Sequence, residues 1–128
     1  MRDKPRKRRG LGMLRKVKLF FLPPDFVLAS QVLKAGLTEV SVFGIGELGT
    51  ALVGRLKEQG IIVNYWYDSN VSDSQHNYMG CSVYHISKVA SQTPKTVVIA
   101  SEAFEDDMIN TCLSYGYNGR ILSLSGNN

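Results

Sequence analysis

Two patterns of hydrophobic residues alternate along this chain. In one, neighbouring positions are mostly apolar, β-branched or aromatic, which is typical of buried strands. In the other, apolar residues recur every three or four positions, which is the period of a helix that packs against a core. The strand pattern occurs at residues 40–43, 61–67, 80–84, 96–100 and 120–124, and the helical pattern at 25–35, 47–59, 87–91 and 104–115.

Strands that alternate with helices indicate βαβ units, in which helical crossovers join parallel strands. The sequence therefore predicts the α/β class, with one parallel sheet of about five strands and helices on both faces. The first helix is expected to begin after Pro23 and Pro24, with Asp25 as its N-cap, and to end at Gly36. A chain of 128 residues fits a single domain.

A glycine-rich motif joins the strand predicted at 40–43 to the helix predicted at 47–59. It consists of Gly44, Ile45, Gly46, Glu47, Leu48 and Gly49. The next predicted strand ends in Asp68, which lies 19 residues after Gly49. A G-x-G-x-x-G motif between a strand and a helix, with an acidic residue about 20 positions further on, is the fingerprint of dinucleotide-binding Rossmann domains. We therefore predict a Rossmann-like nucleotide-binding domain over residues 23–128.

Each part of this motif has a physical task. Gly44 permits a tight turn, Gly46 lets a pyrophosphate approach the backbone, and Gly49 lets the helix lie close to the sheet. The free N–H groups at the start of the helix favour an anion. Asp68 is placed to accept hydrogen bonds from ribose hydroxyls and to repel a 2′-phosphate, which favours NAD over NADP. The alternative is a glycine turn that binds nothing.

Four segments of the chain together resemble a known group of proteins: 42–49, 66–69 (Trp-Tyr-Asp-Ser), 80–84 (Gly-Cys-Ser-Val-Tyr) and 97–101 (Val-Val-Ile-Ala-Ser). They are similar to the small Rossmann-type domain, also called CoA-binding-like, of polysaccharide-biosynthesis and nucleotide-sugar-modifying proteins. The resemblance covers residues 38–125 and implies binding of a nucleotide or nucleotide-sugar rather than a reaction. It adds Ser69 and Ser101 to the expected cofactor-binding residues, which already include the glycine motif and Asp68.

The chain also departs from that group. It lacks the catalytic domain that normally follows this module, and it lacks the membrane helices of those proteins. Both departures argue against an independent enzymatic activity. No residue is therefore assigned a catalytic role, and a separate catalytic partner domain or protein is expected to supply any reaction.

The charge of the chain is concentrated at one end. Residues 1–18 hold nine basic residues and one acidic residue, a local charge of +8, while the other six basic and ten acidic residues give the rest −4. Such a run is typical of a disordered, solvated segment, so residues 1–22 are expected to lie outside the folded domain. An anionic membrane surface is a candidate partner of residues 1–18. Nucleic acid is less favoured, because no aromatic residue interrupts the charges.

The apolar run at residues 19–22 is too short to span a membrane, which takes about 20 residues.

The two cysteines, Cys81 and Cys112, have no metal-ligand spacing, and Cys112 shares a predicted helix face with Met108 and Ile109. A buried Cys112 thiol, no metal site and a cytoplasmic location, with or without attachment at the inner membrane surface, are therefore expected.

Several other side chains carry weaker signals. Tyr84 and Lys88 have the Y-x-x-x-K spacing of short-chain dehydrogenases, but they straddle a predicted strand end, so packing and solvation are favoured over catalysis. Acidic residues at the start of the helix predicted at 104–115 suit the helix dipole better than a phosphate. They are Glu102, Glu105, Asp106 and Asp107. Of three consecutive aromatic residues, Tyr65, Trp66 and Tyr67, at least one is expected in the core.

Three functional hypotheses follow. The first is a module that binds an NAD-type dinucleotide or a nucleotide-sugar in a polysaccharide-modifying system. The second is an interaction domain with a vestigial pocket that docks through its basic N-terminal segment. The third, which is weaker, is a ligand-gated regulatory domain of the type that controls ion transport. The three intact glycines and Asp68 favour ligand binding over the vestigial pocket.

Overall fold

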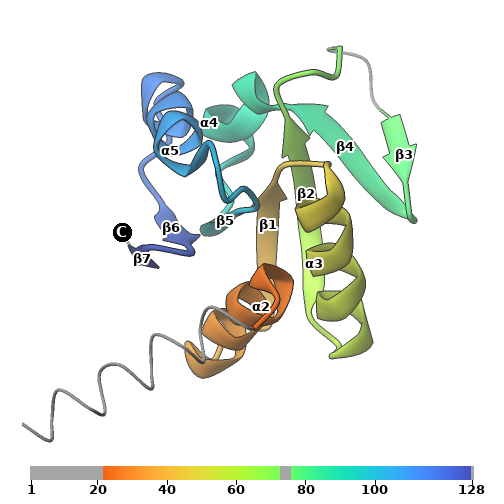
Figure 1. The fold of residues 1–128 in the computed structure, drawn as a ribbon. Helices are drawn as coiled ribbons and strands as arrows, with labels where there is room; N and C mark the ends of the chain where they lie inside the picture. Colours follow the sequence, from red (N-terminus) through yellow and green to blue (C-terminus); the bar gives the residue numbers. More distant parts are fainter. Residues whose placement is uncertain (1–21, 73–75, 128) are drawn as a thin grey trace, which may run out of the picture.

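The computed structural model describes residues 22–72 and 76–127 as one α/β domain (Figure 1). Nearly all of the predicted basic segment, residues 1–21, therefore lies outside the described residues. The strands are β1 (Glu39–Phe43), β2 (Ile62–Asp68), β3 (His76–Tyr78), β4 (Cys81–His85), β5 (Thr96–Ile99), β6 (Arg120–Ser123) and β7 (Gly126–Asn127). The helices are α2 (Pro24–Lys34), α3 (Glu47–Glu58), the 3₁₀ turn η1 (Ile86–Lys88), α4 (Val89–Gln92) and α5 (Glu105–Ser114).

All of these strands belong to a single sheet with the order β3-β4-β2-β1-β5-β6-β7. The five inner strands are parallel, and the short β3 and β7 pair antiparallel at the two edges. The chain runs outward from β1 through β2 to β4, then crosses back to β5 and continues to β6. This reversal places a topological switch point between β1 and β5, where open α/β sheets bind their ligands. The predicted parallel sheet of about five strands is confirmed.

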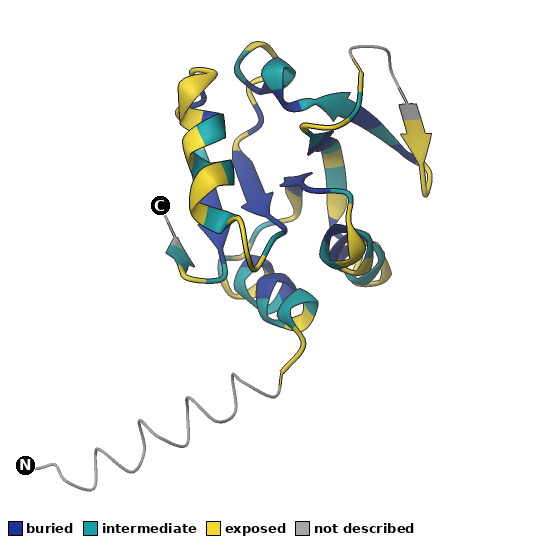
Figure 2. Ribbon diagram, turned by 45° about the horizontal axis from the view of Figure 1, so that its top comes forward, coloured by how far each residue is buried: buried dark blue, intermediate teal, exposed yellow. Residues whose placement is uncertain are grey.

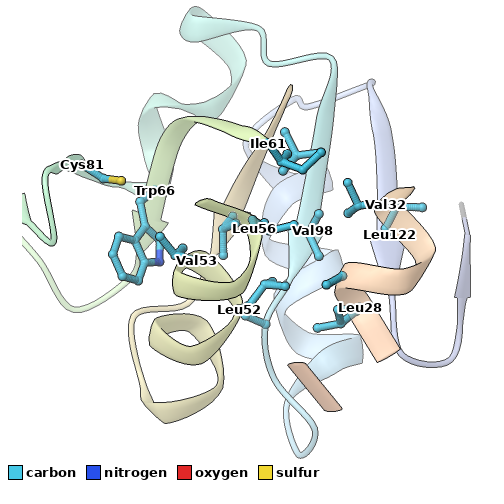
Figure 3. Packing of buried hydrophobic residues seen from close by; sticks show 14 of the residues in the cluster. Leu28, Val32, Leu52, Val53, Leu56, Ile61, Trp66, Cys81, Val98 and Leu122 are labelled. Carbon is cyan, nitrogen blue, oxygen red and sulfur yellow. The ribbon is translucent and has the colours of Figure 1, made fainter. Parts of the chain in front are cut away.

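One face of the sheet is covered by α2 and α3. Side chains from both helices meet the inward side chains of the strands in one continuous apolar layer (Figure 3). Along β1, Val40 and Val42 point into this layer, because successive side chains of a strand alternate between faces. The fully buried members from the helices are Leu28, Val32, Leu52, Val53 and Leu56.

The other face is covered by η1, α4 and α5. Phe43, Tyr67 and Ile99 point from the strands into this second layer, where they meet Cys112 of α5. Met108 and Ile109 pack against the same cluster, as predicted from their shared helix face. Helices therefore cover both faces of the sheet, which confirms that prediction. The outer surface of α5 is largely exposed, whereas β5 is buried along its whole length (Figure 2).

The first helix differs from its prediction in one respect. Pro23 occupies the N-cap position, and Asp25 lies in the first turn of α2 instead. The Asp25 carboxylate accepts a hydrogen bond from Arg55 of α3 at 2.9 Å. The side chain that was predicted to cap α2 therefore forms an ion pair with another helix instead.

The short edge strands β3 and β7 were not predicted. Within residues 22–72 and 76–127, no helix has the length and hydropathy that a membrane crossing requires.

Ser41 carries the one buried side-chain oxygen that has no hydrogen-bond partner among the described residues. It lies in the middle of β1 and is fully buried. An unpaired buried hydroxyl costs about 1–3 kcal/mol. We therefore expect Ser41→Ala to raise the free energy of unfolding by about 1 kcal/mol, measured by urea denaturation. Ser123→Ala is the matched control: its hydroxyl is equally buried but donates to the Gly126 carbonyl at 3.1 Å, so its removal should lower stability.

Burial also determines how stability depends on alkaline pH. Desolvation raises the pKa of the Cys112 thiol from 9.0 to about 12 and that of the Tyr117 hydroxyl from 10.0 to about 12. Between these values the unfolded chain has lost protons that the folded chain still holds, so the free energy of unfolding must fall as pH rises. Each group contributes a slope of up to about 1.4 kcal/mol per pH unit.

We expect this loss of stability to begin near pH 9, and urea denaturation between pH 8 and 11 measures it. In Cys112→Ala the slope between pH 9 and 10 should be smaller, even though this variant is less stable overall. A free energy of unfolding that stays constant up to pH 11 would show that these two groups titrate equally in both states.

Candidate functional site

The glycine motif forms the turn between β1 and α3, at the carboxyl edge of the sheet. The N–H of Gly44 donates to the carbonyl of Tyr67 at 2.7 Å, and the N–H of Ala100 donates to the carbonyl of Phe43 at 2.9 Å. The turn is therefore tied to the end of β2 on one side and to the end of β5 on the other. This position is the switch point of the sheet.

Two of the three glycines are required by the backbone conformation or by close packing within the domain. Gly44 has φ +122°, which L side chains rarely adopt, and a Cβ there would lie 2.8 Å from the carbonyl oxygen of Ala100. Gly49 is buried in the first turn of α3, and a Cβ at this position would overlap the carbonyl of Gly44. The conformation of the turn and its contact with Ala100 thus explain Gly44, and the close approach of α3 to the turn explains Gly49.

Gly46 is different. Its φ of −74° is open to any residue, and an added Cβ would meet no other atom within 4 Å. The residue is exposed to solvent. No conformational or packing requirement within the described chain explains a glycine here.

The start of α3 offers unpaired hydrogen-bond donors. Gly46 is the N-cap and supplies no side-chain cap, and the first helical bond runs from the N–H of Thr50 to the carbonyl of Gly46 at 2.9 Å. The N–H groups of Glu47, Leu48 and Gly49 precede that bond, so they lack helical partners. Together with the helix dipole they form a site suited to an anion.

Asp68 lies beside the glycine motif at the end of β2. One carboxylate oxygen accepts the N–H of Ile45 at 3.1 Å, and the other accepts the N–H of Asn70 at 2.8 Å. A carboxylate oxygen has two lone pairs, so each oxygen of Asp68 keeps one lone pair that can accept a hydrogen bond from a hydroxyl of a ligand. Ser69, the next residue, is exposed.

On the opposite side of the motif, a cavity of about 630 Å³ opens between α3 and the loop that follows β5. Ser101 lines it together with Gly46, Glu47 and Leu48, and the Ser101 hydroxyl accepts the N–H of Phe104 at 3.0 Å. The structure therefore brings Ser101 to the glycine motif from β5 and Asp68 to it from β2. Ser69 does not line this cavity.

Three contributors to the site were not identified from the sequence. The indole N–H of Trp66 donates to the carbonyl of Gly44 at 2.6 Å, in the buried layer under the turn. Pro24 and Asp25 of α2 line the cavity beside the glycine motif. The alternation of Tyr65, Trp66 and Tyr67 predicted burial of a ring, but no local pattern specifies that the buried indole holds the turn.

Two of the remaining sequence candidates, Tyr84 and Glu105, make structural contacts. Tyr84 lies in β4 and Lys88 in η1, and the Tyr84 ring packs against Tyr65, with centroids 5.6 Å apart. Glu105 accepts the N–H groups of Leu124 and Ser125, which ties the start of α5 to the turn before β7. In the described part of the chain, no three His, Cys, Asp or Glu side chains are grouped as metal ligands would be.

The Trp66 hydrogen bond can be tested. Trp66→Phe leaves the carbonyl of Gly44 without this donor in a buried position, so we expect the free energy of unfolding to fall by about 2 kcal/mol. NMR amide shifts should change throughout residues 44–49. Tyr65→Phe, at the adjacent position, removes a hydroxyl for which no hydrogen bond is found in the described residues, and it should change stability by less than about 0.5 kcal/mol. Equal effects of the two substitutions would contradict this role of the indole.

No family model matches this chain, and no curated protein sequence matches it either. Among solved structures it is similar to RSP, a Rex-family repressor, with a TM-score of 0.52 and 14% identity over 73% of this chain and 48% of that chain. It also aligns with UDP-D-quinovosamine 4-dehydrogenase from Vibrio fischeri, with a TM-score of 0.49 and 15% identity over 70% of this chain and 81% of that chain. The chain thus spans about half the length of the repressor, with which it shares a Rossmann-type fold.

Proposed function

We propose that this chain is a nucleotide-binding module that takes an NAD-type dinucleotide or a nucleotide-sugar at the glycine motif. Gly46 carries this proposal. Gly44 and Gly49 are explained by the turn and by the close approach of α3, whereas nothing within 4 Å requires a glycine at 46. A pyrophosphate that lies against the backbone at the start of α3 would require it, because a Cβ would stand between the phosphate and the N–H groups.

Asp68 supports the same proposal from the β2 side. Its carboxylate oxygens already hold the N–H groups of Ile45 and Asn70, so the side chain is fixed in position before any ligand arrives. The free lone pairs suit the two hydroxyls of a ribose. A 2′-phosphate at the same place would meet a carboxylate of the same charge, so we propose NAD rather than NADP among the dinucleotides.

The motif resemblance described above further supports a place in polysaccharide or nucleotide-sugar metabolism. We assign no catalytic residue, so any reaction on the bound nucleotide would require a partner domain or protein. The membrane or nucleic-acid contact of residues 1–18 remains a proposal that rests on charge alone.

Two glycine substitutions separate binding from folding. In Gly46→Ala we expect the free energy of unfolding to change by less than about 1 kcal/mol, since the new methyl group meets no other atom. Its affinity for the nucleotide should fall at least tenfold. Gly49→Ala is the contrasting variant: its methyl group would overlap the Gly44 carbonyl, so it should lose stability whether or not nucleotide is present.

Thermal shift and calorimetry with NAD, NADP, coenzyme A, ADP and UDP-sugars measure these effects. A ligand at about 100 times its Kd adds roughly 2.7 kcal/mol of stability, which shifts the Tm visibly. If no nucleotide binds at millimolar concentration, the interaction domain with a vestigial pocket becomes the better description. If Gly46→Ala binds as well as the wild type, the ligand does not approach the backbone at this residue.

A further inference from the structure

The cavity beside the glycine motif has room for more than a phosphate. It measures about 630 Å³, within the range typical of small-molecule sites. Three elements form its walls: the start of α3 at Gly46, the loop after β5 from Ala100 to Phe104, and the start of α2 at Pro24. Asp68 is absent from its lining and lies on the β2 side of the motif.

The glycine motif thus has two different surroundings: Asp68 lies on its β2 side, and the cavity lies on its β5 side. In Rossmann domains a dinucleotide crosses the switch point, with its phosphates at the glycine turn and its two halves on either side of it. If Asp68 holds the first ribose, the second half of the ligand must extend over β5 into this cavity. This step rests on the proposed function.

The charged residues that line the cavity are all acidic. Glu47 and Glu102 line it with exposed carboxylates, and Asp25 adds a third carboxylate that is paired with Arg55 at 2.9 Å. No lysine, arginine or histidine is among the lining residues. Away from the N–H groups at the start of α3, a negatively charged group in this cavity would therefore be repelled, while hydroxyl groups or a cation would find acceptors.

Phe104 adds a flat apolar surface at the rim. Its side chain is 64% exposed, although the neighbouring helix buries its own apolar face against the sheet. The Phe104 N–H is fixed by the Ser101 hydroxyl, so the residue that presents the ring is anchored to the loop that forms the cavity wall. An exposed ring in this place suits stacking against a planar or sugar ring.

From these observations we infer that the cavity lined by Phe104, Glu102 and Glu47 receives the second half of the nucleotide ligand, and that this half is a ring without negative charge. A cationic ring such as oxidised nicotinamide fits best, and a neutral sugar is accepted. Sugars that carry a carboxylate are rejected. The selectivity comes from Glu102 and Glu47, and the stacking comes from Phe104.

Pairs of ligands that differ mainly in one charge test this inference on the full chain. Oxidised NAD should bind at least threefold more tightly than NADH, and UDP-glucose at least threefold more tightly than UDP-glucuronate, in calorimetry at low ionic strength. Added salt should reduce both ratios, because the carboxylates are exposed. In Glu102→Gln both ratios should move toward one.

Asp106→Asn is the matched control, because it removes the same charge from the first turn of α5 but does not line this cavity. It should leave both ratios unchanged. Phe104→Ala should weaken binding of NAD relative to ADP, which has no second half. Circular dichroism confirms that each variant is folded.

The outcomes separate the two proposals. If ADP, the dinucleotides and the UDP-sugars all fail to bind, the nucleotide site itself is wrong and this inference falls with it. If they bind but the ratios lie near one, or if Glu102→Gln and Asp106→Asn change them equally, the nucleotide site stands and only the inference about the cavity is overturned.

Discussion

The carbonyl of Gly44 is the point at which the sheet, the first crossover helix and the candidate site meet. It accepts the indole N–H of Trp66 from β2 at 2.6 Å, and it faces the α carbon of Gly49 in α3 so closely that no side chain fits between them. A buried carbonyl without a partner would be costly, so the indole stabilises this conformation of the turn. The position of α3, and with it the direction of its free N–H groups, follows from that contact.

Much of this arrangement could be predicted because it is local in sequence. The strand at Val40, the turn at Gly44 and the helix from Glu47 follow one another without interruption, and each has a distinct pattern of apolar residues and glycines. Asp68 was found by its spacing, since the length of one helix and one strand determines where the second strand ends. The five parallel strands and the coverage of both faces followed from the same alternation.

The remaining features depend on contacts between distant residues. Asp25 has the sequence context of an N-cap, but the guanidinium of Arg55, 30 residues later, takes its carboxylate. The acidic helix start around Glu105 was expected to interact with the helix dipole, yet this carboxylate also binds the N–H of Leu124 at 2.5 Å. Phe104 shares the helical spacing of the apolar residues with Met108, and only the fold shows that its ring remains outside the core.

The helix α2 has a consequence for how the domain holds together. Its buried face packs against the same apolar layer as α3, its Asp25 binds Arg55 of α3, and its Gln31 donates to the Ser123 carbonyl of β6 at 3.0 Å. It thus bridges the β1–α3–β2 half of the sheet and the β5–α5–β6 half, which otherwise meet mainly along β1 and β5. Local opening of either half must therefore detach α2 from the other, so the two halves unfold as one cooperative unit rather than as separate βαβ repeats.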